Sequence, residues 1–268
     1  MTLDEHGPFG AEVVEEIPLS RAPLALVLAQ IRFPVPTVLV SPTAASELAG
    51  RFADDYPAFD EQSEFSLLVG PGGVQERPTS QPIWKFTSED DRWNLSIART
   101  QVTLLTEDYT SREEFLTRFE SAWAIFAGYA RPHRVDRSGF RYVNQLTESN
   151  RVAPLDELIR PALMAGDAVP RASGAELSFS MNQAEFALPG EGGLTARWGS
   201  VPTGFVVDPS IQPTTERSWM LDLDAFGGPR PLRGFDARTQ IGELAERAYR
   251  FFRWATTDRF IKEFGGAS

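Results

Sequence analysis

Apolar and polar positions alternate most clearly near the midpoint of the chain, in the stretch 134–147. From 140 to 146, every second residue faces the same side of an extended strand, and all of these except one are apolar or aromatic. The exception is Asn144, whose amide is costly to bury unless it is hydrogen-bonded. Arg141 belongs to the opposite side. The pattern therefore predicts a strand with one buried side, in which Asn144 is paired and Arg141 faces solvent.

Further strands are predicted on both sides of this stretch. The apolar run 23–33 has the length of a strand, turns polar at Gln30 and Arg32, and is stopped by Pro34. Short turns separate the other strands, as in antiparallel meanders. These strands are 65–69, 83–87, 93–98 and 101–105 before the midpoint, and 176–182, 185–188, 194–201 and 219–224 after it.

Each meander precedes a long helix with a wide apolar stripe, and a shorter helix is predicted to begin at Ser41. Ser111 and Glu114 form a capping box at the start of the first long helix, and Asp236 caps the second. The stripe residues are Phe115, Phe119, Ala122, Trp123, Phe126 and Ala130 in the first long helix, and Ile241, Leu244, Ala248, Phe251, Phe252 and Ala255 in the second.

These elements predict an α+β protein with two antiparallel β-meanders, each followed by a long amphipathic helix. One small sheet cannot cover such a helix alone, so the two units should pack together as one compact body. The recurrence of the same order suggests a pseudo-twofold duplication. We expect a loose acidic tail at 1–16, a first α+β half at 17–150 and a second at 151–268.

Composition excludes several kinds of chemistry. The 268 residues contain no cysteine, which excludes disulfides, thiolate metal sites and cysteine nucleophiles. Only His6 and His133 could supply an imidazole, and no G-x-S-x-G motif accompanies them. The glycine-rich turns 70–73 and 190–193 lack the Lys-Ser/Thr ending of a phosphate loop. We therefore expect no cofactor.

Charge and hydropathy limit the partners. The formal net charge of −11 at pH 7 opposes contact with a nucleic-acid backbone, so a nucleic-acid partner is not expected. No apolar run approaches the roughly 20 residues that span a bilayer, and the acidic N-terminus has no signal-peptide core. The sequence predicts a cytoplasmic protein without a membrane partner.

Four polar residues are the best candidates for a binding site: Gln30, Arg32, Arg141 and Asn144. We expect the polar end of the first strand to lie near the central strand, where the two arginines would offer forked donors to a carboxylate or phosphate. The simpler alternative is two surface arginines in ion pairs with this acidic chain.

Asp222 and Asp224 are a second candidate, because they share one face of a predicted strand. Such a pair of carboxylates could hold a hard cation such as magnesium. Alternating polar positions are also what any half-exposed strand shows, so a solvated strand face explains the same pattern.

Three stretches carry a resemblance to a known family: PLALVLAQIRF near the start, RSGFRYVNQL at the middle and FRWATTDRFIKEFG at the end. In these, the chain resembles a sporadically distributed family of uncharacterised bacterial proteins of about this length. Its members usually carry a glutamate in the first motif, where this chain has Leu26. The resemblance implies no assigned activity, and the patchy distribution suggests accessory or defence-type loci.

Two main readings of function follow, beside a third, nucleic-acid binding through a local arginine patch. The first is a non-catalytic cytoplasmic protein-interaction module, such as an accessory, defence or toxin-neutralising subunit, whose partner is a protein encoded nearby or a second copy in a homodimer. The alternative is a metal- or anion-dependent ligand-binding protein or hydrolytic enzyme that uses Asp222 and Asp224, or Arg32 and Arg141.

Overall fold

The computed structural model describes residues 7–10, 14–70, 73–172, 174–190, 192–206 and 212–266. Over these residues, nine strands form one continuous antiparallel sheet, the main sheet, in the order β2-β3-β4-β5-β1-β7-β10-β9-β8. In chain order they are β1 (Leu24–Arg32), β2 (Ala58–Gly70), β3 (Gly73–Thr87), β4 (Trp93–Ala98), β5 (Gln101–Thr106), β7 (Arg137–Thr147), β8 (Asn182–Leu188), β9 (Gly192–Val201) and β10 (Ser218–Gly227). Two short strands, β6 (Arg134–Val135) and β11 (Arg230–Pro231), pair separately.

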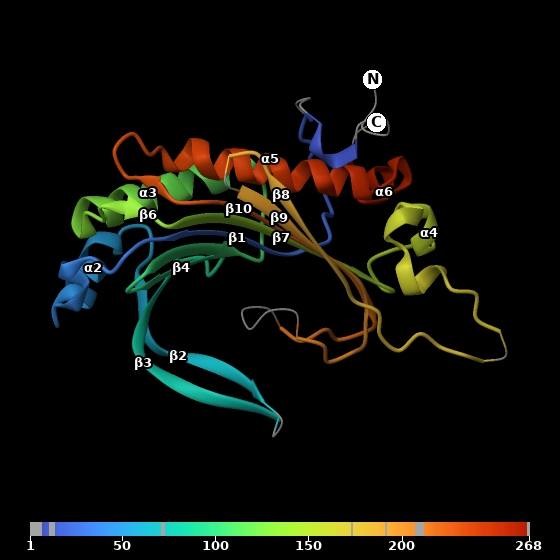
Figure 1. The fold of residues 1–268 in the computed structure, drawn as a ribbon, viewed down its shortest axis with the longest axis horizontal. Coiled ribbons are helices and arrows are strands. Elements are labelled where there is room, and N and C mark those ends of the chain that lie inside the picture. The colour runs from blue at the N-terminus through green and yellow to red at the C-terminus, as the bar shows by residue number, and fades with distance from the viewer. Residues whose placement is uncertain are drawn as a thin grey trace.

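Helices cover one side of the main sheet and leave the other without a helical layer (Figure 1). The α-helices are α2 (Ala44–Phe52), α3 (Arg112–Ala130), α4 (Leu155–Leu158), α5 (Ala237–Ala255) and α6 (Asp258–Glu263). Short 3-10 helices lie at Gly7–Phe9, Thr37–Val40, Pro161–Leu163 and Ala165–Ala168. The long helices α3 and α5 contact each other and lie across the same side, which we call the helix side. The opposite side is called the open side.

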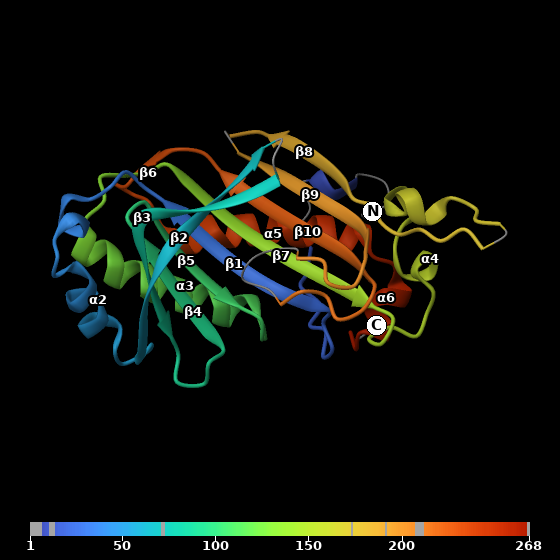
Figure 2. The same ribbon diagram turned by 90° about the horizontal axis from the view of Figure 1, so that it is seen from below.

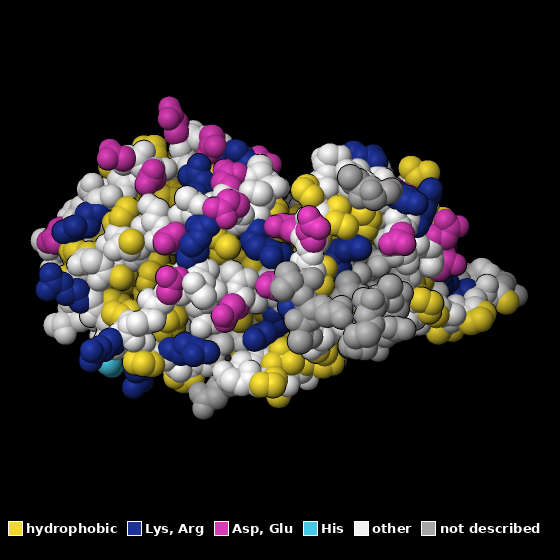
Figure 3. Space-filling model, turned by 90° about the horizontal axis from the view of Figure 1, so that it is seen from above, with side chains coloured by type: hydrophobic (Ala, Val, Ile, Leu, Met, Phe, Trp, Pro, Cys, Tyr) yellow, Lys and Arg dark blue, Asp and Glu magenta, His cyan; other side chains and the backbone are white. Residues whose placement is uncertain are grey.

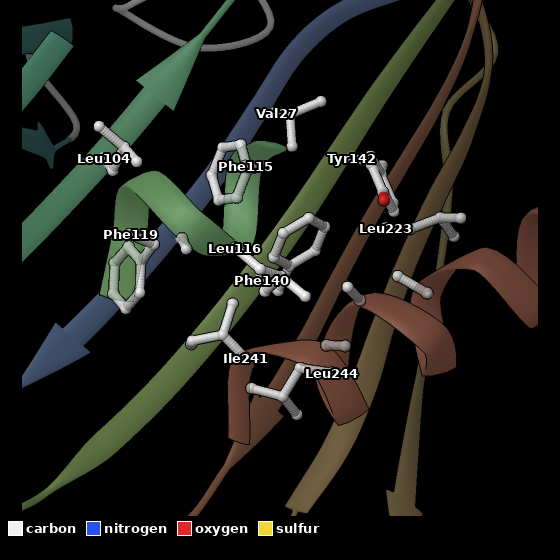
Figure 4. Close-up of a cluster of buried hydrophobic side chains, with 14 of the residues drawn as sticks. Val27, Leu104, Phe115, Leu116, Phe119, Phe140, Tyr142, Leu223, Ile241 and Leu244 are labelled. Atoms are coloured by element: carbon white, nitrogen blue, oxygen red, sulfur yellow. The ribbon is translucent and has the colours of Figure 1, made fainter. Parts of the chain in front are cut away.

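The alternation along β7 explains why the helix side is buried. Phe140 packs against Phe115 of α3 and against Tyr142, and Figure 4 shows Phe140 among side chains of α3 and α5. The predicted apolar stripes of both long helices are buried against these strands. Ser111 and Asp236 cap α3 and α5 by accepting hydrogen bonds from the backbone amides of Glu114 and Thr239. The buried side of β7 and both caps were correctly predicted from the sequence.

The predicted fold class, two meanders each followed by its own long helix and related by a pseudo-twofold duplication, is wrong. The structure is dominated by strands, and nine of those described join into one sheet. The join occurs because β1 hydrogen-bonds to β5 on one edge and to β7 on the other. Both edges of a strand can pair, and a local pattern of apolar residues does not show which distant strand fills the second edge.

Two strand predictions also differ from the structure. The predicted short strand 65–69 is the outer part of β2, which pairs with β3 over almost its whole length. The predicted strand 176–182 is irregular until β8 begins at Asn182, and Phe179 is 50 % exposed. Ser180 passes so close to Gly199 of β9 that its carbonyl oxygen would lie 1.9 Å from a Cβ there. A backbone crossing, and not a regular ladder, therefore sets the conformation before β8.

Two segments project from the main sheet on its open side. The β2–β3 hairpin leaves the plane of the sheet on the side away from α3 and α5 (Figure 1) and crosses in front of the central strands in the perpendicular view (Figure 2). The connection from β9 to β10 also lies on this side (Figure 2). The open side is therefore flanked by the hairpin and by the β9–β10 connection.

Candidate binding surface on the open side of the sheet

Charged side chains gather on the open side of the four central strands. They occupy the positions that alternate with those facing the helices, so the regular geometry of the sheet places them all on the same side. The six residues, called the charged row from here on, are Arg32 on β1, Arg137 and Arg141 on β7, Arg197 on β9, and Asp222 and Asp224 on β10. Four arginines against two aspartates make this surface locally basic in a chain whose net charge is −11.

Asp222 is the most buried member of the charged row. Its side chain is 5 % exposed, and both of its oxygens accept charge-assisted hydrogen bonds. Arg141 donates to Oδ1 from Nε at 2.7 Å and to Oδ2 from Nη2 at 3.0 Å, which is a bidentate contact. Arg197 donates to Oδ2 from Nη1 at 3.1 Å. Asp222 therefore links β7, β10 and β9 and holds two guanidinium groups in fixed positions.

Arg137 and Asp224 form a second, more exposed pair. Arg137 donates from Nη2 to Oδ2 of Asp224 at 3.0 Å, and its guanidinium lies over the ring of Phe226 at 5.1 Å from the ring centre. Gly139 makes room for this contact, since a Cβ at that position would lie 2.8 Å from Nη1 of Arg137. A larger residue at Gly139 would have to displace the guanidinium.

Arg32 is the exposed end of the charged row. It donates from Nε to Oε1 of Gln30 at 2.8 Å, and Gln30 donates in turn to the hydroxyl of Thr103 on β5 at 3.1 Å. Arg32 pairs with no carboxylate among the residues that the structure describes. Its guanidinium is therefore positioned by an amide while its charge stays available to a partner.

The structure brings three of the four predicted binding residues onto one surface. Gln30 pairs in register with Gly139 and Leu28 pairs with Arg141, so Gln30, Arg32 and Arg141 are neighbours on the open side. Asn144 lies on the helix side, buried, and its amide nitrogen donates to the carbonyl of Leu221 at 3.3 Å. The binding role of these residues stays a prediction.

Asp222 and Asp224, the candidate metal ligands, are both engaged by arginines. Three guanidinium groups surround the two carboxylates, and their positive charge opposes a cation at this position. Over the described parts of the chain, no group of three or more His, Asp or Glu side chains is arranged to hold a metal ion.

An apolar area adjoins the charged row at one end. Leu26, Val143, Val201 and Met220 form a buried cluster on the open side, against which Met181 and Phe205 pack. Phe205 contacts Phe179 with ring centres 5.7 Å apart, and Phe179 and Val206 are both about half exposed. We call Phe179, Phe205 and Val206 the aromatic rim.

The sequence-based reasoning missed Arg137, Arg197 and the aromatic rim. Arg137 has the same alternation phase as Arg141 on the central strand, so this residue could have been found from the pattern. Arg197 lies on a different strand, and its place beside Asp222 follows only from the pairing of β9 with β10. The aromatic rim is formed by two irregular segments, so the alternation of apolar and polar residues in the sequence did not predict it.

The helix side offers a different surface. Arginines and acids alternate over it without a patch of one sign (Figure 3). Arg238 of α5, for example, pairs with Glu113 and Glu120 of α3. Of the two histidines, His133 is exposed after the end of α3, and His6 lies outside the described residues.

A buried polar cluster lies beneath the N-terminal segment on the helix side. The Tyr109 hydroxyl contacts that of Tyr142 at 3.2 Å and donates to Oε1 of Glu16 at 3.2 Å, and Arg112 pairs with Glu16 at 3.6 Å. Burial raises the pKa of the Tyr142 phenol to about 12 and also raises that of Tyr109. Both phenols are therefore neutral near neutral pH and act as hydrogen-bonding groups that fasten the segment.

Comparison of the whole sequence with protein-family models gives no match, and its comparison with curated proteins gives none either. The resemblance to a bacterial family stays a prediction. No helix in the described ranges has the length and apolar character needed to cross a membrane.

Proposed function

We propose that this protein is a non-catalytic interaction module that binds an acidic segment of another protein on the open side of its sheet. The observation that carries the proposal is the charged row, in which four arginines face two aspartates on a chain of net charge −11. Complementary charge steers association and selects partners. In this proposal the protein works in the cytoplasm, as the sequence predicts.

The composition of the surface supports a protein partner. Arginine and aromatic residues are enriched at protein interfaces, and they carry much of the binding energy there. The charged row supplies arginines that are already held in place by Asp222 and Gln30. The aromatic rim supplies exposed apolar groups beside them. Side chains that are fixed before binding lose less conformational entropy when the partner arrives.

The β2–β3 hairpin also favours a partner that lies against the open side. β3 pairs with β2 along its whole length, but it pairs with β4 only from Trp84 to Thr87. The outer part of the hairpin is therefore a two-stranded ribbon without support from the rest of the sheet. Such ribbons are marginally stable alone, and a bound partner would supply the missing contacts.

The experiment that tests the proposal is affinity capture followed by measurement of the affinity between the purified components. The wild type, Arg32→Gln with Arg197→Gln, and a control that carries Arg230→Gln with Arg233→Gln are used as bait in extracts of the native cells. The control removes the same charge from exposed positions outside the charged row. We expect the captured protein to bind the open-side variant about tenfold more weakly and the control as tightly as the wild type.

Measuring the affinity at several salt concentrations is a second test. The affinity for the wild type should fall with ionic strength more steeply than the affinity for the open-side variant. Equal binding to both variants, or no capture by the wild type, would contradict the proposal. If the wild type forms a homodimer that dissociates in the open-side variant, the partner is a second copy of this chain and not a different protein. Melting temperatures of all three proteins show whether the variants are folded.

A further inference from the structure

A long connection between β7 and β8 packs against one end of the main sheet. It spans residues 148–181 and contains α4 and two 3-10 helices. Its first part is fixed, because Ile159 forms a β-bridge with Thr256 and the Leu158 carbonyl accepts from the Thr257 amide at 3.0 Å. Figure 1 shows α4 and the segment that follows it beyond the end of the sheet. Connections of this length in a compact protein commonly serve a function.

A cleft of about 720 Å³ lies between this connection and the end of the sheet. Leu146, Ser200 and Trp219 line it from β7, β9 and β10, and all three belong to the helix-side set of alternating positions. Met164 and Leu177 line it from the connection. The cleft is therefore separate from the charged row, and its volume is within the range of small-ligand sites.

Charged side chains of both signs line the cleft without pairing. Arg151 and Arg171 donate to the carbonyls of Ala153 and Gly166, while Arg217 makes no hydrogen bond or ion pair with any described residue. The carboxylates of Glu148 and Glu176 line the same cleft, and neither approaches an arginine of the described chain within ion-pair distance. Charges of both signs that line one cleft without pairing with each other suit a ligand that carries both signs.

Trp219 and Asp167 also line the cleft, and each carries a buried polar atom that has no hydrogen-bond partner among the described residues. One is the indole Nε1 of Trp219, a donor on a side chain that is 3 % exposed, and the other is Oδ2 of Asp167, an acceptor. The second oxygen of Asp167 is held by the hydroxyl of Ser200 at 2.7 Å. A buried polar group without a partner is destabilising.

We propose that the cleft binds a short free peptide. Its terminal carboxylate pairs with Arg217, its terminal ammonium pairs with the carboxylates of the cleft, and its backbone lies against the side chains of Trp219 and Asp167. Apolar side chains of the peptide contact Leu146 and Met164. This site does not depend on the proposed function of the open side, because the two lie on opposite sides of the sheet.

The test uses the tripeptide Ala-Ala-Leu with both ends free, together with its acetylated form and its carboxyl-terminal amide, in titration calorimetry on the full chain. We expect the free peptide to bind and each blocked form to bind about tenfold more weakly, because each lacks one charge. Absence of binding by the free peptide at millimolar concentration would overturn the proposal. Equal affinity for the free and acetylated forms would also overturn it.

Two variants locate the site. Arg217→Gln should weaken the free peptide about tenfold while leaving the affinity for the carboxyl-terminal amide unchanged. Trp219→Phe keeps most of the ring volume, and it should weaken all three peptides and remove any peptide-induced change in tryptophan fluorescence. Arg233→Gln, an exposed arginine outside the cleft, is the control and should bind as the wild type does. An unchanged affinity in Arg217→Gln, with the variant folded, would show that the peptide binds elsewhere.

Discussion

The two sides of β7 place adjacent residues in opposite environments. Phe140, on the helix side, packs edge-on against Phe115 and Tyr142, with ring centres 5.4 and 4.7 Å away. Arg141, the next residue, points to the open side and makes a bidentate contact with Asp222. The packing of Phe140 is nondirectional and excludes water, whereas the hydrogen bonds of Arg141 are directional and partly exposed to solvent.

This difference separates stability from recognition. The helix side buries aromatic rings from two helices and several strands, so its free energy comes from removal of apolar surface from water. The open side holds arginines in ordered positions and leaves Arg32 and Arg197 accessible. We infer that the helix side supplies most of the stability of the fold, and that the open side is the surface on which the proposed partner would bind.

The largest expected effect is on the helix side. Phe140→Ala removes a fully buried ring, and we expect the free energy of unfolding to fall by about 3–5 kcal/mol. Gln145→Ala on the open side of the same strand removes one hydrogen bond, to Ser218, and should cost about 1 kcal/mol. Urea denaturation measures both values. Similar losses in the two variants would contradict the division of roles between the two sides.

A smaller effect is expected within the charged row. Asp222→Asn removes the charge that two guanidinium groups share, and Arg141 is itself largely buried. We expect a loss of about 2–4 kcal/mol, below the upper range for buried pairs because Arg197 is 38 % exposed.

Asp224→Asn is the matched comparison for this effect. Its side chain is 26 % exposed and has one arginine partner, so the same substitution should cost about 1 kcal/mol or less. Urea denaturation at low and high salt separates the two cases. The loss at Asp224 should shrink in high salt, and the loss at Asp222 should persist. Equal losses of unfolding free energy in Asp222→Asn and Asp224→Asn would contradict the expectation that the more buried ion pair contributes more to stability.

The smallest effect appears at alkaline pH and belongs to the helix side. The unfolded chain releases tyrosine protons near pH 10, whereas the pKa of about 12 keeps Tyr142 neutral in the folded chain. The raised pKa stabilises the fold fully below pH 10, and this contribution is lost as pH rises towards 12. For Tyr142 alone, we expect the free energy of unfolding to be about 1 kcal/mol lower at pH 11 than at pH 9, and the raised pKa values of Tyr56 and Tyr109 lower it further. Tyr142→Phe should reduce this dependence, and an unchanged slope would assign it to other tyrosines.

The sequence by itself determined the local features of this protein. Ser111 and Asp236 cap helices as predicted, because a capping bond joins residues only three positions apart. The sides of β7 and the burial of Asn144 also follow from local alternation. Gln30, Arg32 and Arg141 were found because each interrupts an apolar pattern on a strand.

Only the tertiary structure decided how these pieces combine. The pairing of β1 with β7 made one sheet from two predicted meanders, and it brought Gln30 beside Gly139 across a separation of more than one hundred positions. The pairing of β9 with β10 placed Arg197 on Asp222. The physical reason is that each strand has two edges of equivalent backbone donors and acceptors, so that its own residues fix which side is buried, while the rest of the chain selects its neighbours.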